Sequence, residues 1–109
     1  MNYEILKDEE TGLYRLEIDA AFNVLKSYLE SEIQQDMVLC KLLQNRISSA
    51  SLSSFNLSGN LYDITLKQAK ITISNQFDET DSLTLDSEAF LKLLEDWSKF
   101  VTQGSQTTT

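Results

Sequence analysis

Apolar residues recur at three- and four-residue steps from residue 22 to residue 47, and this stripe constrains the fold more than any other feature. Such a period places the apolar side chains on one face of a helix. Asp19 is a suitable N-cap, because its carboxylate can accept hydrogen bonds from the first free amides. We expect any break at Gln34-Gln35-Asp36 and an end in the serine-rich segment 48–51. The stripe consists of Phe22, Leu25, Tyr28, Leu29, Ile33, Met37, Cys40, Leu43 and Ile47.

Segments on both sides of this helix alternate apolar and polar residues, which is the pattern of half-buried β-strands. Tyr3–Lys7 and Leu13–Ile18 are expected to form a hairpin, because the polar segment Asp8–Gly12 between them ends in a glycine. The link Lys67-Gln68 is not an Asn-Gly type turn, so pairing there is predicted from alternation alone. Asn75–Asp81 is expected to be an acidic loop. The later strands are predicted at Ser53–Leu57, Leu61–Leu66, Ala69–Ser74 and Ser82–Leu85.

A second apolar stripe predicts a helix near the end of the chain. Asp86 is its expected N-cap, and Leu85 before the cap can pack on Phe90 as a hydrophobic staple. Residues 104–109 have nothing to bury and are expected to form a flexible tail. We predict a single α+β domain over residues 1–103, in which one long helix, open to a break, and the C-terminal helix pack on a largely antiparallel sheet. The second stripe consists of Phe90, Leu93, Leu94, Trp97 and Val101.

Acidic residues outnumber basic ones by seventeen to nine, and the absence of histidine leaves a formal charge of −8. This charge disfavours nucleic acid and anionic membrane surfaces and suits a basic protein partner, whose approach it can accelerate. The alternative is that the charge only maintains solubility. No apolar run reaches the ~20 residues of a membrane span, the acidic N-terminus is unlike a signal peptide, and Cys40 has no disulfide partner. A cytoplasmic location is therefore expected.

The two densest acidic groups are the candidate contacts for a partner, with a purely solvated surface as the alternative at each. The second group also suggests a calcium loop. However, the sixth and twelfth positions counted from Asp78 are Leu83 and Ala89, where an EF-hand needs glycine and glutamate, so we predict no metal ion. The candidate residues are Asp8, Glu9 and Glu10 in the first turn and Asp78, Glu79 and Asp81 in the later loop.

An enzyme would need a nucleophile, an acid or base, and usually a pocket. Cys40 is the only thiol, and it lies on the helical stripe, where a buried cysteine serves as a small apolar residue. No histidine is present to activate it. The chain also lacks a glycine-rich phosphate loop and Cys/His metal spacing, so we predict no catalysis and no cofactor. An enzyme of unrecognised type stays as an alternative, which a deep pocket holding carboxylates of raised pKa would favour.

Sparse positions along nearly the whole chain carry a family resemblance. They are Met1, Tyr3, Glu4, Leu6 and Asp8 at the start, Gly59, Tyr62 and Ile73-Ser74-Asn75 in the middle, and Ser82, Leu83, Leu85, Phe90-Leu91, Phe100-Val101 and Gln103 at the close. At these positions the chain resembles the uncharacterised bacterial YacL family. Most of them are residues that a fold requires, so the resemblance implies a shared architecture and transfers no catalytic site.

Size, charge and expected compartment also resemble those of the immunity proteins of bacterial contact-dependent growth-inhibition systems. The first hypothesis is therefore an immunity protein that binds a basic nuclease toxin domain and occludes its substrate site. A carboxylate reaching into the cationic site could bind its arginines in place of substrate phosphate. The second hypothesis is a YacL-like cytosolic housekeeping protein that binds another partner.

Overall fold

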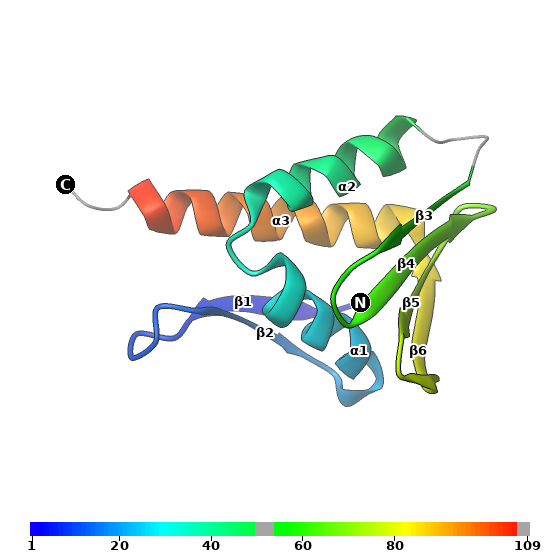
Figure 1. Cartoon of the computed structure of the whole chain (residues 1–109). Coiled ribbons are helices and arrows are strands. Elements are labelled where there is room, and N and C mark those ends of the chain that lie inside the picture. Colours follow the sequence, from blue (N-terminus) through cyan, green and yellow to red (C-terminus); the bar gives the residue numbers. More distant parts are fainter. Residues whose placement is uncertain (50–53, 107–109) are drawn as a thin grey trace.

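Two antiparallel sheets and three α-helices are formed within residues 1–49 and 54–106, the ranges that the computed structural model describes (Figure 1). This confirms the predicted α+β class. The first sheet is the predicted hairpin of β1 (Tyr3–Lys7) and β2 (Tyr14–Ile18). Four more strands form the second sheet in sequence order; they are β3 (Phe55–Ser58), β4 (Tyr62–Lys67), β5 (Lys70–Asn75) and β6 (Asp78–Asp86). Ser53, predicted to begin the first of these, lies outside the described residues.

The long helical segment is interrupted where the sequence predicted a break. Gln34 has a φ of 37°, a left-handed conformation that ends the first half, and Asp36 Oδ1 then accepts a 3.0 Å hydrogen bond from the amide of Leu39 at the start of the second. Asp19 also acts as predicted, because its Oδ1 accepts a 2.9 Å bond from the amide of Ala21. The segment comprises a 3-10 turn (Ala20–Phe22), α1 (Asn23–Tyr28), a π-helical turn (Leu29–Ile33) and α2 (Met37–Ser49).

The closing helix, α3 (Ser87–Gln106), extends beyond the predicted boundary at residue 103. Its predicted apolar stripe is buried throughout, and Trp97 at the centre is fully enclosed. The ring of Tyr14 packs edge-on against Trp97 and Phe100, with centroids 6.4 and 5.7 Å away, which ties β2 to this helix. Residues 107–109 lie outside the described ranges, so the flexible tail stays a prediction. No helix in the described part of the chain is long and apolar enough to cross a membrane.

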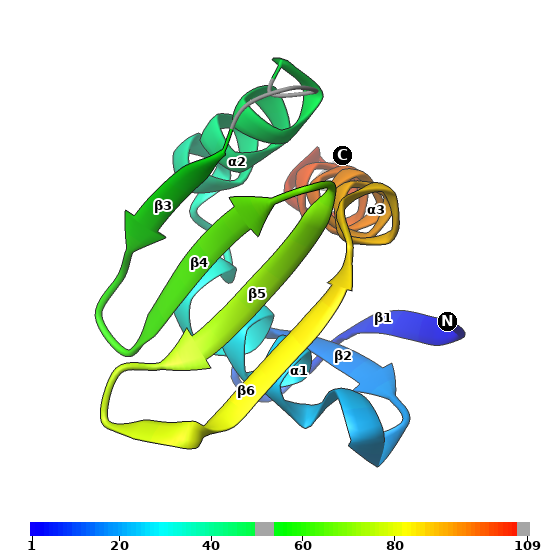
Figure 2. The same ribbon diagram turned by 90° about the vertical axis from the view of Figure 1, so that its right-hand side faces the viewer.

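The four-stranded sheet packs one face on the helices and turns the other outward, as the face-on view in Figure 2 shows. Alternation explains this arrangement, because Tyr62, Ile64 and Leu66 of β4 are buried while the residues between them are not. β4 and β5 are joined by the two-residue turn Gln68-Ala69, whose φ angles of 52° and 62° are those of a type I′ hairpin. The remaining buried positions of this sheet are Ile71, Ile73 and Leu85.

Candidate partner-binding surface

The first acidic group lies in the β1–β2 turn, and one of its members holds the turn together. Asp8 Oδ1 accepts hydrogen bonds from the amides of Glu10 (2.9 Å) and Thr11 (3.4 Å), and its Oδ2 lies 3.8 Å from an Arg15 nitrogen. The Gly12 amide donates to the Asp8 carbonyl at 2.7 Å, and Gly12 supplies the positive φ of 75° that closes the turn. Of the three acidic residues of this turn, Glu9 and Glu10 are exposed and are thus left to meet a partner.

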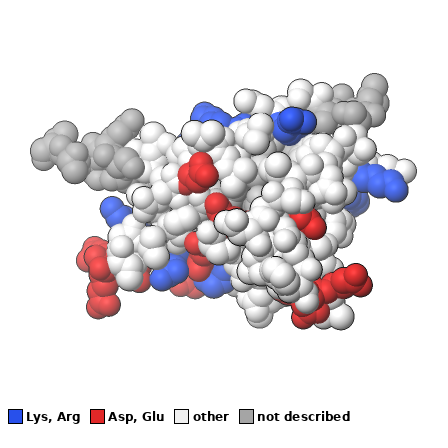
Figure 3. All heavy atoms as spheres, viewed as in Figure 1, with Lys and Arg blue, Asp and Glu red and all other residues white. Residues whose placement is uncertain are grey.

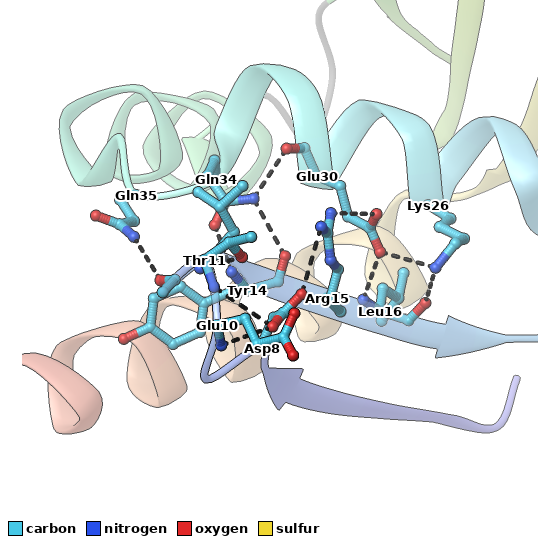
Figure 4. A network of polar contacts seen from close by, with 12 residues as sticks. Asp8, Glu10, Thr11, Tyr14, Arg15, Leu16, Lys26, Glu30, Gln34 and Gln35 are labelled. Atoms are coloured by element: carbon cyan, nitrogen blue, oxygen red, sulfur yellow. Dashed lines mark hydrogen bonds and ion pairs between the residues drawn. The ribbon is translucent and has the colours of Figure 1, made fainter.

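Behind this turn, charged side chains of the helical segment bind the outer edge of β2 (Figure 4). Glu30 Oε2 accepts from the backbone amide of Leu16 and from Lys26 Nζ, both at 2.8 Å. The same ammonium donates to the Leu16 carbonyl at 2.8 Å. Arg15 approaches Glu30 Oε1 at 3.4 Å. One carboxylate and one ammonium therefore satisfy both backbone groups of Leu16, so this network has a structural role.

Gln34 completes the cover of the β2 edge. Its Oε1 accepts from the Tyr14 amide at 2.6 Å, and its Nε2 donates to the Tyr14 carbonyl at 3.1 Å, as a neighbouring strand would. The left-handed backbone of Gln34 turns its own carbonyl toward Trp97, whose indole nitrogen donates to it at 2.7 Å. Gln35 Nε2 donates to the Gly12 carbonyl at 3.1 Å. The helical break thus positions the contacts that join the first hairpin to the helices.

The second acidic group lies on a strand, so the predicted loop Asn75–Asp81 is wrong. Only Gln76 and Phe77 form the turn between β5 and β6, and pairing resumes at once with Asn75 opposite Asp78. The register then shifts, since Ser74 pairs with Ser82, and residues 79–81 have no counterpart on β5. This irregularity explains how a strongly acidic segment is accommodated on an edge strand, because its side chains leave the regular ladder.

Hydrogen bonds fix two of the three carboxylates in this segment. Asp78 Oδ1 accepts from the Thr80 hydroxyl at 2.6 Å and from the Thr80 amide at 3.1 Å, and these bonds lower the pKa of Asp78 below its ordinary value. Asp81 Oδ2 accepts from Asn75 Nδ2 at 3.1 Å. Glu79 is fully on the surface. The three carboxylates therefore lie together on one hairpin tip, and two of them are oriented by their neighbours.

Phe77, at the turn itself, is the feature that the sequence analysis overlooked. Its side chain is 79% exposed, although its amide is held by a 2.8 Å bond to Asn75 Oδ1. A large apolar ring at the tip of an ordered hairpin contributes nothing to the core. A signal was present in the sequence, because the three residues on either side of Phe77 are all polar. We call Phe77, Asp78, Glu79 and Asp81 the hairpin tip.

The two acidic groups do not form one site. The β1–β2 turn and the β5–β6 turn lie at opposite ends of the molecule in Figure 1, and Figure 3 shows acidic side chains gathered separately at the lower left and lower right of that view. Basic side chains lie over the upper part of the same face and also beside the acidic group at the lower left, where Arg15 lies 3.8 Å from Asp8. A single partner surface of ordinary size would therefore contact one group or the other, and only the second contains an exposed aromatic ring.

A third carboxylate site is formed between distant parts of the chain. Glu32, on the π-helical turn, accepts hydrogen bonds from the backbone amides of Asn60 (2.5 Å), Leu61 (3.4 Å) and Tyr62 (2.9 Å). Gly59 is required beside it, because a Cβ atom there would stand 2.1 Å from Glu32 Oε1. The adjoining pocket of about 220 Å³ is open to solvent. Both oxygens of Glu32 are committed to the β3–β4 turn, which makes this carboxylate a structural anchor.

Cys40 occupies the position expected for a small apolar residue. Its side chain is 0% exposed, and Sγ lies 3.6 Å from the Leu94 carbonyl of α3. Burial raises the pKa of the thiol to about 11, with Gln44 acting in the opposite direction through a hydrogen bond. The reactive thiolate is therefore scarce at neutral pH. Among the described residues, no group of three or more His, Cys, Asp or Glu side chains is placed to hold a metal ion.

The fold and these surfaces define a small α+β protein with an exposed acidic-aromatic hairpin. Comparison with protein families then identifies the chain: it belongs to the uncharacterised protein family UPF0231, whose model matches residues 1–89. This supports the prediction of membership in an uncharacterised family. The matching positions from Phe90 to Gln103 that also suggested a resemblance lie beyond the matched range. Comparisons with curated proteins and with solved structures give no match.

Proposed function

We propose that this protein is a non-enzymatic binding module whose hairpin tip docks on a basic protein partner. The observation that carries this proposal is the ring of Phe77, 79% exposed beside Asp78, Glu79 and Asp81. Buried aromatic anchors commonly contribute most of the binding free energy of an interface, and a charged rim adds orientation and speed of association. In a chain with a formal charge of −8, the rim selects a cationic partner.

Membership in an uncharacterised family supports the more general of the two sequence hypotheses, a cytosolic housekeeping protein with a partner of its own. The immunity hypothesis is its rival, in which the partner is a nuclease toxin domain. In that case the carboxylates of the hairpin tip would enter the cationic substrate site and form bidentate bonds with its arginines. Occlusion of the site would then block the nuclease without any chemistry by this protein.

Photo-crosslinking tests the position of the interface. Benzoylphenylalanine incorporated at position 77 should capture a basic protein in the native host, whereas the same group at position 38 should not. Val38 is a suitable control because it is an equally exposed apolar residue, at 82%, on another element, α2. Equal capture from both positions, or capture of an acidic protein at position 77, would contradict the proposal.

Binding of the captured partner can then be measured with purified proteins. Phe77→Ala should weaken it about 30-fold, which corresponds to the loss of ~2 kcal/mol expected for an aromatic anchor, and Val38→Ala should not change it. Asp78→Asn with Glu79→Gln should slow association more than Glu9→Gln with Glu10→Gln, although both pairs remove two charges. An equal effect of the two pairs would mean that only net charge matters and would refute docking at the hairpin tip.

The immunity hypothesis has a separate test. The protein is co-expressed with the nuclease toxin domain expected to be encoded immediately upstream of it. Protection of the cells that is lost in Phe77→Ala would support inhibition through the hairpin tip. Failure to protect, together with no complex by size exclusion, would exclude the immunity role and leave the housekeeping partner as the proposal.

A further inference from the structure

We propose that the protein forms a symmetric dimer in which β1 pairs antiparallel with β1 of a second copy, giving a sheet of order β2-β1-β1-β2. The inference goes beyond the proposed function, because it concerns a different surface from the hairpin tip. It is carried by the hydrogen-bonding pattern of β1, by the grooves beside it and by the charges along it.

The pattern of the first hairpin leaves every second residue of β1 with free backbone groups. In an antiparallel pair, directly opposed residues alternate between bonded and non-bonded pairs. The backbone amide of Asp8 donates to the Leu13 carbonyl at 2.8 Å, which makes Asp8 and Leu13 a bonded pair. Two residues further along each strand, the next bonded pairs are Leu6 with Arg15 and then Glu4 with Glu17. The N–H and C=O groups of the intervening residues, Tyr3, Ile5 and Lys7, therefore point away from β2.

The two outer edges of the hairpin differ in what covers them. Along β2, the outward groups of Tyr14 and Leu16 are bound by side chains of Gln34, Glu30 and Lys26. Along β1, no described residue accepts from or donates to the outward groups, and Figure 2 shows β1 as the outermost element on its side of the molecule. An open edge of this kind is a ready template for another strand.

Hollows adjoin this edge and are lined by α3, so an added strand would have room for its side chains. One hollow, of about 290 Å³, includes Ile5, Phe100 and Gln103, and the next, of about 460 Å³, includes Met1 and Lys92. Between them, the Tyr3 hydroxyl donates to Asp96 Oδ2 at 2.5 Å. Tyr3, Ile5 and Lys7 all project toward α3, as their partners Tyr14 and Leu16 do. A new strand would therefore cover partly exposed apolar side chains.

The residues of β1 are self-complementary, which selects a second copy as the occupant. When two β1 strands pair antiparallel with Ile5 opposite Ile5 of the second copy, Lys7 lies directly opposite Tyr3 of the second copy. The outward N–H and C=O groups of Tyr3, Ile5 and Lys7 then all find partners. Lys7 has no ion pair within the described residues, and its ammonium lies 5.7 Å from the centroid of the Tyr14 ring. In the dimer it comes beside the Tyr3–Asp96 pair of the other chain, twice by symmetry. Pairing of two copies through the edge strand β6 would instead place its acidic segment opposite the same acidic segment of the second copy.

Light scattering and sedimentation across a concentration series test the dimer. We expect the wild-type protein to reach twice the chain mass of 12.4 kDa. Lys7→Pro removes an outward N–H and no bond of the hairpin, so it should yield a monomer with unchanged circular dichroism. Lys7→Ala keeps the N–H and removes the ammonium that would lie beside Asp96 of the second copy, together with its contact to the Tyr14 ring, so it should weaken the dimer several-fold. Phe77→Ala should leave the dimer intact, which separates this test from that of the proposed function.

Amide hydrogen exchange gives a second readout that does not depend on a variant. Protection of the Ile5 and Lys7 amides should rise with protein concentration, whereas the Leu6 amide, already bonded to β2, should be protected throughout. A single species of 12.4 kDa at every concentration would overturn the proposal, as would a Lys7→Pro variant that dimerises like the wild type. Protection of Ile5 only when another protein is added would likewise overturn it and assign the edge to a foreign strand.

Discussion

Replacing Gly59 by alanine should destabilise the protein through a residue far away in the sequence. The new Cβ would stand 2.1 Å from Oε1 and 2.9 Å from Cδ of Glu32, so this side chain must move away. Its hydrogen bonds to the amides of Asn60 and Tyr62 are then lost. Gly59 does not have the positive φ seen at Gly12, so alanine is compatible with its backbone angles, and the one close backbone contact of the new Cβ is 3.2 Å to the Tyr62 carbonyl oxygen.

The magnitude follows from where the two amides lie. Tyr62 is 4% exposed, and leaving its amide without a charged acceptor costs about 1.5–3 kcal/mol. The Asn60 amide is exposed, and water can replace Glu32 there at a cost of roughly 0.5–1 kcal/mol. The lower entropy of the unfolded alanine chain returns about 0.4–1 kcal/mol. We expect a net loss of about 1.5–3 kcal/mol, or a melting temperature lower by roughly 6–12 °C for a domain of this size.

Urea and thermal unfolding followed by circular dichroism measure the effect, and a double-mutant cycle isolates its cause. If alanine at position 59 acts only by displacing the carboxylate, Gly59→Ala should cost less than about 0.5 kcal/mol in a Glu32→Ala background. Gly12→Ala is the matched control, since nothing lies within 4 Å of its Cβ and only its φ of 75° is unfavourable. Its cost should not depend on Glu32. An undiminished cost of Gly59→Ala without Glu32 would show that the alanine does not act by displacing this carboxylate.

Three further predictions concern the interior and its polar contacts. Burial raises the pKa of Asp96, but bonds from Lys92 and Tyr3 outweigh it and hold the pKa below its ordinary value. The stabilisation from Asp96 is therefore present above the unfolded pKa of about 3.9 and is lost as the pH falls below it. Asp96→Asn should reduce the decrease in the free energy of unfolding, measured in urea, that accompanies acidification. An unchanged decrease would contradict this. Cys40, with its pKa raised to about 11 by burial, should react with a thiol reagent at neutral pH only after unfolding, so rapid labelling of the native protein would count against its enclosure. Gln34→Ala should lower the free energy of unfolding in urea by about 2 kcal/mol, because both backbone groups of Tyr14 lose a partner; a change under about 0.5 kcal/mol would show that water replaces the side chain.

Periodic burial explains why much of the fold could be predicted from the sequence. The stripes ending at Ile47 and Val101 are buried as expected, except that Phe22 and Met37 are only partly buried, since a helix in contact with a core must repeat its apolar residues at helical spacing. Strands β1 and β2 were predictable for the same reason, with a period of two. The break at Gln34 could be placed because three polar residues interrupt the stripe there.

The hairpins that end the second sheet were less accessible to sequence reasoning. Gln68 and Ala69 are not typical of a type I′ turn, and the pairing of β4 with β5 on either side imposes their positive φ angles. Asp78 and Asp81 disfavour a strand by composition, yet the ladder of β5 with β6 and the register shift accommodate both. Tertiary pairing overrides local preference in both cases.

Carboxylates that bind distant backbone amides could not be predicted at all. Glu30 binds the amide of Leu16, and Glu32 binds the amide of Tyr62 thirty residues further along the chain. Nearly every residue has a backbone amide, whatever its side chain. The sequence therefore contains no pattern that shows which amide a distant carboxylate binds. The six candidate acidic residues were chosen by local density, and the carboxylates that bind distant backbone amides are not among them.

The side-chain cover of β2 gives the molecule two levels of cooperativity. Within the described residues, no backbone ladder joins the first hairpin to the four-stranded sheet. The outer edge of the hairpin is held by Gln34, Glu30 and Lys26 and by the packing of Tyr14 on Trp97. Side-chain bonds can be exchanged for water one by one, whereas a ladder opens as a unit. Residues 1–18 can therefore detach in a sub-global opening of lower free energy than complete unfolding. Such an opening would bare the face of α3 around Trp97 while β3 to β6 remain folded, and we expect proteolysis of the native protein to begin there.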